Sequence, residues 1–203
     1  MRFKYLAALG LLASPALAAP AAPSAELSIT GAITPGVCNV TLSNDGALDF
    51  GAYGYHDLKE DDWTELPSKG VRLDVTCGRS TTVSLDVRDN TPDPALSDTD
   101  KFSLGFQGEQ AIGWYSVRAA NIDYDGRTGQ WIRQTAPGQW ALTNVFHKNT
   151  EHAWATLPNQ QPVSLSAAKV TLNVTPNIVP RKHLDTAQAL ALQGSLSIAL
   201  RYL

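Results

Sequence analysis

The sequence predicts an all-β protein, a β-sandwich with one disulfide. Stretches in which every second residue is apolar recur along the chain, and this alternation is typical of strands with one buried face. Turn-forming residues separate the stretches, and long helical periodicity is absent from the sequence. The sequence also contains two cysteines, Cys38 and Cys77, which can form one disulfide. Many short strands with turn signals between them favour a sandwich.

Five stretches before the last one carry the alternation, and each is predicted to be a strand of a half-buried antiparallel sheet. Their apolar sets are Leu27, Ile29 and Ile33; Val71, Leu73, Val75 and Cys77; Val83, Leu85 and Val87; Phe102, Leu104 and Phe106; and Val170, Leu172 and Val174. The sequences SNDG, DNTPDP, DYDGRTG, APGQ and TPNIVP are predicted turns. Helical signals are limited to a turn or two near Lys59 and Leu184.

The last predicted strand covers residues 190–203. Its apolar set is Leu190, Leu192, Gly194, Leu196, Ile198, Leu200 and Tyr202, and the residues between them are mostly small or polar. Chain ends usually fray, so a regular amphipathic strand at this position calls for an explanation.

Residues 1–18 are typical of a secretory signal peptide. Arg2 and Lys4 supply the positive start, an apolar stretch follows, and the small residues Ala16 and Ala18 mark a cleavage site. The apolar stretch is too short to span a bilayer as a helix. We therefore expect an exported protein. Removing Arg2 and Lys4 changes the formal charge from −3 to −5. Because the sequence has no basic stripe, nucleic acid is not expected as a partner.

Both cysteines follow the predicted signal. In an exported protein, two cysteines are expected to form one disulfide, here between Cys38 and Cys77. Such a bond would stabilise the fold by about 4 kcal/mol, chiefly by restricting the unfolded chain. A C-x-x-C redox motif is absent, and a metal site would need more ligands nearby.

Four features occur in a fixed order after the signal. They are Gly31 seven residues before Cys38, LDFG at residues 48–51 as a short predicted strand that ends in glycine, Cys77 at the end of an alternating strand, and the last strand with Tyr202 next to its end. Together they resemble the subunits of chaperone–usher fimbriae, the pilins of Gram-negative bacteria. The likeness is greatest to the fimbrial-protein-like group classified as a domain of unknown function. It covers nearly the whole mature chain except residues 90–162.

The resemblance implies an incomplete, pilin-type immunoglobulin-like β-sandwich over residues 31–203. Such a domain lacks its last strand, and the C-terminal strand forms one wall of the groove that remains. A periplasmic chaperone first lends a strand to this groove, and the N-terminal extension of another pilus subunit later replaces it. The implied binding residues are Leu192, Gly194, Leu196, Ile198, Leu200 and Tyr202.

The implied function is that of a structural fimbrial subunit, assembled by donor-strand complementation at an outer-membrane usher and involved in cell adhesion. The protein would pass through the periplasm to a fimbrium on the cell surface. Gly194 lies nearer the chain end than the corresponding glycine of the family, so the register of the binding pockets stays open. An ordinary last strand inside a complete sandwich is the alternative interpretation.

Residues 19–30 are the candidate donor strand. The inward set is Ala21, Pro23, Ala25, Leu27 and Ile29, of which only Leu27 and Ile29 are large. Pro20 and Pro23 cannot donate to a ladder. Two explanations remain open: the groove that accepts this extension is shallow, or the subunit is terminal in its fibre and seldom uses the extension.

The sequence also carries features of other functions. Five tryptophans, in or beside residues 90–162, could stack on a carbohydrate ligand, as in an adhesin-like tip module, or could pack in the core. A secreted β-sandwich protein outside any fibre is a further alternative. The sequences around Asp123 and Asp125, and around the KEDDW segment, are predicted to be a hairpin turn and a solvated acidic patch.

No enzymatic activity, metal or cofactor is expected. The sequence contains no G-x-S-x-G motif and no phosphate-binding glycine loop. His147 and His152 are five residues apart, which does not fit one helical face, and the other histidines show no metal-binding spacing.

Overall fold

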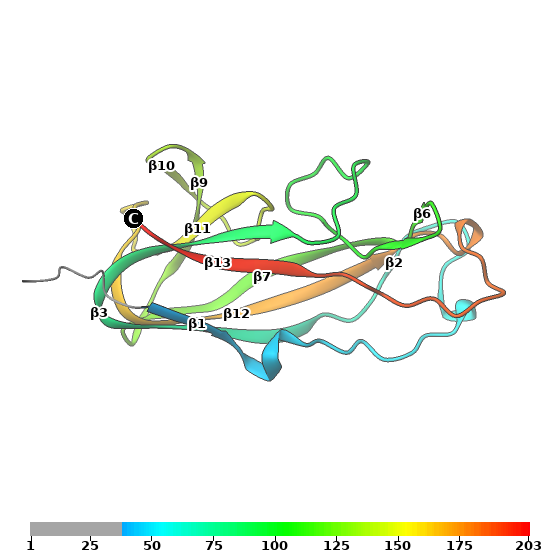
Figure 1. Ribbon diagram of the computed structural model, residues 1–203, viewed down its shortest axis with the longest axis horizontal. Coiled ribbons are helices and arrows are strands. Elements are labelled where there is room, and N and C mark those ends of the chain that lie inside the picture. The colour runs from blue at the N-terminus through cyan, green and yellow to red at the C-terminus, as the bar shows by residue number, and fades with distance from the viewer. Residues whose placement is uncertain (1–37) are drawn as a thin grey trace, which may run out of the picture. The chain divides into compact units, whose positions relative to one another are not determined.

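The computed structural model describes residues 38–203, drawn as a ribbon in Figure 1. Strands dominate this part of the chain, and its helical segments are short 3-10 turns. In chain order the elements are β1 (Cys38–Leu42), η1 (Ser43–Gly46), η2 (Tyr55–Asp57), β2 (Thr64–Glu65), β3 (Lys69–Asp89), β4 (Phe102–Ser103), β5 (Phe106–Gln107), β6 (Gln110–Ala111), β7 (Gly113–Tyr124), β8 (Arg127–Thr128), β9 (Gln130–Ala136), β10 (Gln139–Leu142), β11 (Thr150–Ala155), β12 (Ser164–Ile178), η3 (Arg181–His183) and β13 (Leu196–Tyr202).

The strands form two antiparallel layers that share β3 (Figure 1). One layer has the order β4–β7–β12–β3–β1, and the other has the order β10–β9–β11–β3–β13. β2 and β8 pair at the margins of the first layer, and β5 forms a separate hairpin with β6. Apolar side chains from both layers meet in one core. The predicted all-β sandwich is therefore confirmed.

β3 belongs to both layers because it runs on where the sequence predicts two separate strands. The part that ends at Cys77 pairs with β1 and β12, and the part that begins at Val83 pairs with β13 and β11. In both parts the predicted apolar residues are buried. As a result, β1 and β13 are edge strands that approach each other on one side of the sandwich.

The predicted disulfide is confirmed. Cys38 and Cys77 lie directly opposite each other in the β1–β3 register, with 4.0 Å between their Cα atoms, and their sulfurs are bonded. The bond therefore ties the first described strand to the strand on which both layers are built.

Turn chemistry was also predicted correctly at several positions. DYDGRTG forms the two-residue hairpin between β7 and β8, with Asp125 and Gly126 at φ of 48° and 74°. Positive φ at both central positions is the geometry that Asp-Gly favours in a tight hairpin. SNDG forms η1, and APGQ connects β9 to β10.

Three predictions of local structure are wrong, and the first is the short strand LDFG, because residues 48–51 form no strand. TPNIVP is not a turn, because β12 continues to Ile178 and pairs there with β7 and β2. Phe106 does not join Phe102 and Leu104 in the core and is 40% exposed. The cause is Gly105, whose φ of +90° turns the chain out of the strand before Phe106.

The last strand is shorter than predicted, since β13 begins at Leu196 and not at Leu190. Its ladder partner β3 ends at Asp89, so residues 190–195 have no neighbouring strand to continue the pairing. Two backbone hydrogen bonds hold the end of this segment. The Asn90 N–H donates to the Ser195 carbonyl, and the Gln193 N–H donates to the Leu104 carbonyl.

Several predictions fall outside the described residues. They are the signal peptide at residues 1–18, the donor strand at 19–30 with Ala21, Ala25, Leu27 and Ile29, and the first alternating stretch with Ile33.

A histidine lies in the core among aromatic rings. The ring of His152 in β11 stacks on Trp131 and Phe146, with centroid distances of 5.9 and 4.9 Å. Its Nδ1 donates to the Thr150 carbonyl at 3.1 Å, and its Nε2 accepts from the backbone N–H of His147 at 3.0 Å. The ring is therefore neutral with its proton on Nδ1. Burial, and next the neighbouring His147, lower the pKa of His152 to about 3.

Acid is consequently expected to destabilise the fold through His152. Below a pH of about 6.5 the unfolded chain takes up a proton at this residue, while the folded protein does so only near the lowered pKa. Stability therefore falls as the pH drops between these two values, by about 2 kcal/mol at pH 5. Urea unfolding at pH 7.5 and 5.0 tests this. The difference in unfolding free energy between the two pH values should be about 2 kcal/mol smaller in His152→Gln than in wild type. Equal differences in the two proteins would contradict the lowered pKa of His152.

Candidate functional site

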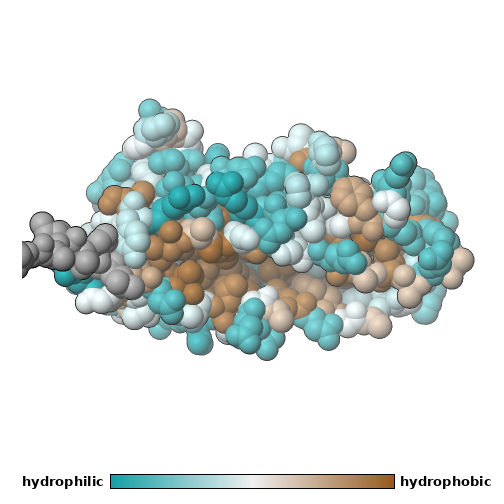
Figure 2. Space-filling model, in the orientation of Figure 1, coloured by the Kyte–Doolittle hydropathy of each residue, from teal (hydrophilic) through white to brown (hydrophobic). Residues whose placement is uncertain are grey.

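An open groove runs along the side of the sandwich where β1 and β13 are the edges. Figure 2 shows apolar residues gathered in a hollow along the middle of this face. One wall consists of β1, η1 and the chain that follows to Tyr55, and the other consists of residues 189–195 and β13. The half-buried apolar residues that border it are Val40, Leu42, Leu48, Tyr55, Leu58, Leu190, Leu192, Leu196 and Ile198.

Three adjoining cavities lie along the groove. The central one holds about 350 Å³, and it shares Leu42, Leu196 and Ile198 with a cavity of about 310 Å³ toward β1. On the other side it shares Leu192 with a cavity of about 290 Å³ near η2. The groove therefore continues through three cavities, and its lining is mostly apolar.

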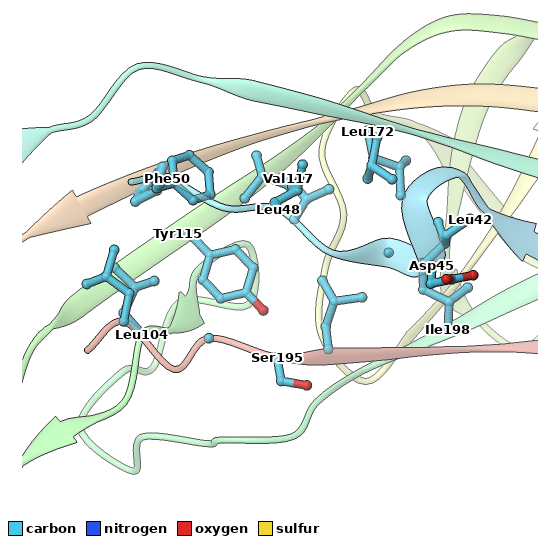
Figure 3. Close-up of a pocket in the computed structure, with 17 residues that line it drawn as sticks. Leu42, Asp45, Leu48, Phe50, Leu104, Tyr115, Val117, Leu172, Ser195 and Ile198 are labelled. Atoms are coloured by element: carbon cyan, nitrogen blue, oxygen red, sulfur yellow. The ribbon is translucent and has the colours of Figure 1, made fainter. Parts of the chain in front are cut away.

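Figure 3 shows how the central cavity is built. Leu48 and Phe50 reach in from the wall that follows η1, and Tyr115 and Val117 of β7 with Leu172 of β12 form the floor. The floor residues are buried members of the main core. The cavity thus opens directly onto the core of the sandwich.

Tyr115 places a hydroxyl in this apolar cavity. Its side chain is only 5% exposed, and its ring stacks on Phe102 at 5.4 Å. Burial, and then the charge of Asp89, raise the pKa of Tyr115 far above its usual value, so the phenol stays neutral. Among the described residues, no group forms a hydrogen bond with this hydroxyl. The hydroxyl is thus one polar group on an otherwise apolar floor.

Gly194 lies against the Tyr115 ring, which explains a glycine at this predicted binding position. A Cβ at residue 194 would lie 2.7 Å from Cε1 of Tyr115 and 3.2 Å from Cδ2 of Leu104. Any larger residue would therefore push on the floor of the central cavity.

β13 offers a free backbone edge to the groove. Directly beyond the two ends of β13, the Ser195 carbonyl accepts from the Asn90 N–H and the Leu203 N–H donates to the Thr82 carbonyl of β3, so the odd-numbered residues of β13 direct their backbone groups toward β3. By the same alternation, Leu196, Ile198, Leu200 and Tyr202 direct theirs to the other side. No strand within residues 38–203 pairs with that side. The groove therefore combines apolar cavities with a row of donors and acceptors.

Tyr202 links the two walls at one end of the groove. Its hydroxyl accepts a hydrogen bond from the backbone N–H of Cys38 at 3.0 Å, although its side chain is 47% exposed. The end of β13 is thereby held beside the start of β1 and its disulfide.

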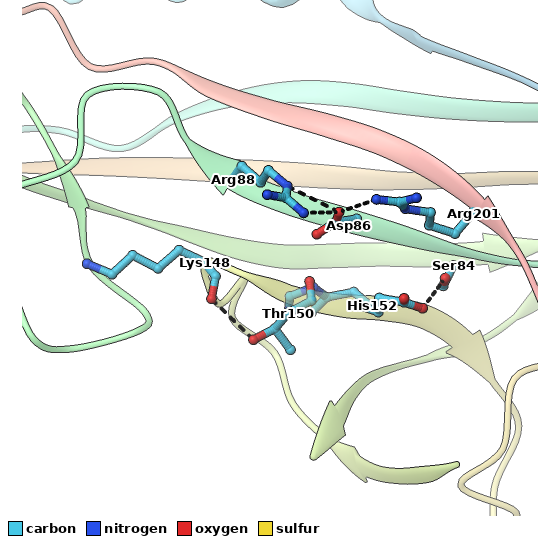
Figure 4. Close-up of polar contacts among 8 residues, drawn as sticks. Ser84, Asp86, Arg88, Lys148, Thr150, His152 and Arg201 are labelled. Atoms are coloured by element: carbon cyan, nitrogen blue, oxygen red, sulfur yellow. Dashed lines mark hydrogen bonds and ion pairs between the residues drawn. The ribbon is translucent and has the colours of Figure 1, made fainter. Parts of the chain in front are cut away.

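The outer face of β13 is polar. Figure 4 shows Asp86 of β3 between Arg88 and Arg201, which lie 3.1 and 3.0 Å from its carboxylate. Burial alone would raise the pKa of Asp86, but the hydrogen bonds from Arg201 and Arg88 outweigh it and hold the pKa below its usual value. The carboxylate is thus ionised at neutral pH, and it orients Arg201 on the face of β13 opposite the groove.

Four of the six predicted binding residues line this groove. Leu192, Gly194, Leu196 and Ile198 line the central cavity, Leu200 packs against the core beside them, and Tyr202 closes the end. The facing wall was missed as part of a site: Leu42, Leu48 and Phe50 were not among the predicted binding residues. The alternating apolar residues of LDFG were the available signal.

The tryptophans divide between core and surface. Trp131 and Trp154 are fully buried and meet edge to face at 4.9 Å, and Trp140 is half-buried. Trp63 is 42% exposed, and its ring lies 6.2 Å from that of Trp114. Lys101 lies over the other ring of this pair, with its Nζ 4.8 Å from the Trp114 centroid.

Residues 38–203 contain neither a cluster of metal-ligating side chains nor a membrane-spanning helix. Within this range, histidine, cysteine and acidic side chains form no group of three that could hold a metal ion. None of the helices in the same range is long and apolar enough to cross a membrane.

Comparison with known proteins places the chain in a family. Residues 27–138 match the family described as Protein of unknown function (DUF1120). The chain is 31% identical to Protein GltF of Escherichia coli (strain K12), in an alignment that covers 97% of this chain and 95% of that protein. It is 24% identical to Uncharacterized protein YhcF of the same organism over 79% of this chain, and this match spans 60% of the relative. The chain belongs to the DUF1120 family.

Proposed function

We propose that this protein is a structural subunit of a fimbrium, held in its fibre by a strand that a partner inserts into the groove between β1 and β13. The observation that carries this proposal is the open side of the sandwich, where core residues line deep cavities beside a free strand edge. A strand added there would complete both the core and the ladder.

The physical argument is that such a surface is unfavourable when it is left empty. Exposed apolar patches and unpaired strand edges promote aggregation, and proteins usually cover them. Here the apolar cavities and the free edge of β13 coincide along the same line, so one extended segment would satisfy both. A groove for a compact small molecule would not need the row of backbone groups.

The partners follow from this function. A periplasmic chaperone would occupy the groove after export, an outer-membrane usher would assemble the subunits, and the fibre would serve adhesion at the cell surface. A carbohydrate-binding tip module is the second candidate function. The observation in its favour is limited to the exposed Trp63 beside Trp114.

Deleting residues 19–25 is expected to leave the domain folded but to prevent it from occupying internal positions in a fibre. These residues belong to the candidate donor strand, whereas the sandwich and its disulfide lie in residues 38–203. Immunogold labelling of tagged protein in isolated fibres measures the positions, and circular dichroism checks the fold.

Full-length protein with the same tag is the control. If the deleted protein still labels fibre interiors, the donor assignment fails. If full-length protein labels only fibre tips, the subunit is terminal and its extension is unused. If neither protein is found in fibres of cells that export both, the fimbrial proposal itself is wrong.

A further inference from the structure

The cavities of the groove and the N-terminal extension of this same chain, residues 19–30, together indicate which kind of strand can fill the groove. This inference rests on the proposed function and names the partner of that groove. The sequence left two explanations for the small residues of the extension, and one of them was a shallow groove.

The cavities are not shallow. Cavities of about 310, 350 and 290 Å³ succeed one another along the groove. Their linings include buried core residues such as Leu73, Leu104 and Leu172. A small side chain above these residues would leave them without contact partners on one side, which loses most of the stabilisation that the site can provide.

The extension of a second copy cannot fill three such cavities. Its large apolar residues are Leu27 and Ile29, two positions apart, so they reach neighbouring inward positions only. The remaining inward residues are Ala21, Pro23 and Ala25. At least one cavity would therefore receive alanine or proline.

The backbone of the extension also fits the free edge of β13 poorly. Leu196, Ile198 and Leu200 present backbone groups that an added strand must pair. Pro20 and Pro23 have no N–H, so the first part of the extension cannot supply a regular row of donors.

We propose that the groove is filled by an extended segment of a different protein. This segment carries large aliphatic or aromatic side chains at three or more alternate positions and has no proline in the paired stretch. The protein therefore joins a fibre next to subunits of another kind and does not form a homopolymer.

Peptide binding to the full mature protein tests the proposal. One peptide has the sequence of residues 19–30, and the other carries Ala21→Ile, Pro23→Val and Ala25→Leu. Fluorescence anisotropy of the labelled peptides gives the two dissociation constants. The substituted peptide is expected to bind at least about a hundredfold more tightly.

Matched variants locate the binding. Ile198→Asp places a charge in the groove, and Ala199→Asp places the same charge on the exposed opposite face of β13. Only the first should abolish binding of the substituted peptide. Leu192→Asp, outside the β13 ladder, serves the same purpose if Ile198→Asp does not fold.

The outcomes separate the two proposals. Equal affinities for both peptides would overturn the inference of a different partner and leave the strand-accepting groove intact. Binding of neither peptide, or binding that Ala199→Asp abolishes as well, would contradict the groove function and the inference together. A homopolymer of the purified protein, seen by size-exclusion chromatography and electron microscopy, would also overturn the inference.

Discussion

Removal of Tyr202 and Leu203 is expected to abolish capture by a fimbrial chaperone and to lower the periplasmic yield about tenfold or more. The truncation deletes the hydrogen bond between the Tyr202 hydroxyl and the Cys38 N–H, which joins the two walls of the groove. It also deletes the last rung of the ladder, from the Leu203 N–H to the Thr82 carbonyl. The remaining strand would fray from this end and widen the groove.

Ser197→Ala is the matched control, because Ser197 lies on the exposed face of the same strand. Co-purification with a tagged chaperone and the yield of periplasmic protein are the two measurements. A complete sandwich should tolerate the truncation, since terminal residues usually contribute little. Equal yields and equal chaperone capture for the two variants would contradict the fimbrial proposal.

Loss of the disulfide is expected to cost about 4 kcal/mol of unfolding free energy, or to prevent folding during export. The bond closes a loop with a sequence separation of 39 residues, so it removes many conformations from the unfolded chain. A typical domain is stable by only about 5–15 kcal/mol, which makes this a large fraction. β1 is five residues long and pairs only with β3 among the described strands, so the wall of the groove depends on the bond as well.

Urea unfolding of the Cys38→Ala, Cys77→Ala variant and of wild type, with and without reductant, measures this effect. Reduced wild type should unfold at the midpoint of the double variant, because both lack the same bond. Wild type that keeps its midpoint after complete reduction would show that the ladder alone holds β1. Peptide binding should fall together with stability.

Much of the fold could be predicted because alternation reports directly on burial. Val71, Leu73 and Val75 face the core as predicted, and the Asp125–Gly126 hairpin follows from local backbone preferences. Local patterns could not reveal that β3 is one continuous strand, because its pairing with both layers depends on residues far away in the sequence.

The same limit applies to the site. The alternation predicted the strand and the resemblance to pilins implied its role as a binding wall, but the start at Leu196 depends on where its partner β3 ends. The facing wall with Leu48 and Phe50 was missed as part of the site, because these residues lie outside any strand in the structure. The buried environment of His152 could not be predicted from the sequence either, because it comes from rings on β9 and on the chain before β11.

The continuity of β3 has a mechanical consequence. A pull on the chain before Cys38 would enter β3 through a covalent sulfur bridge and bypass the short ladder of β1. A pull from a strand seated against β13 would act along the axis of β13, so the hydrogen bonds between β13 and β3 would be loaded in shear and share the force. Both loads would meet on one unbroken backbone, from Lys69 to Asp89. A subunit connected at these two points would transmit tension along a fibre without straining the loops of the sandwich.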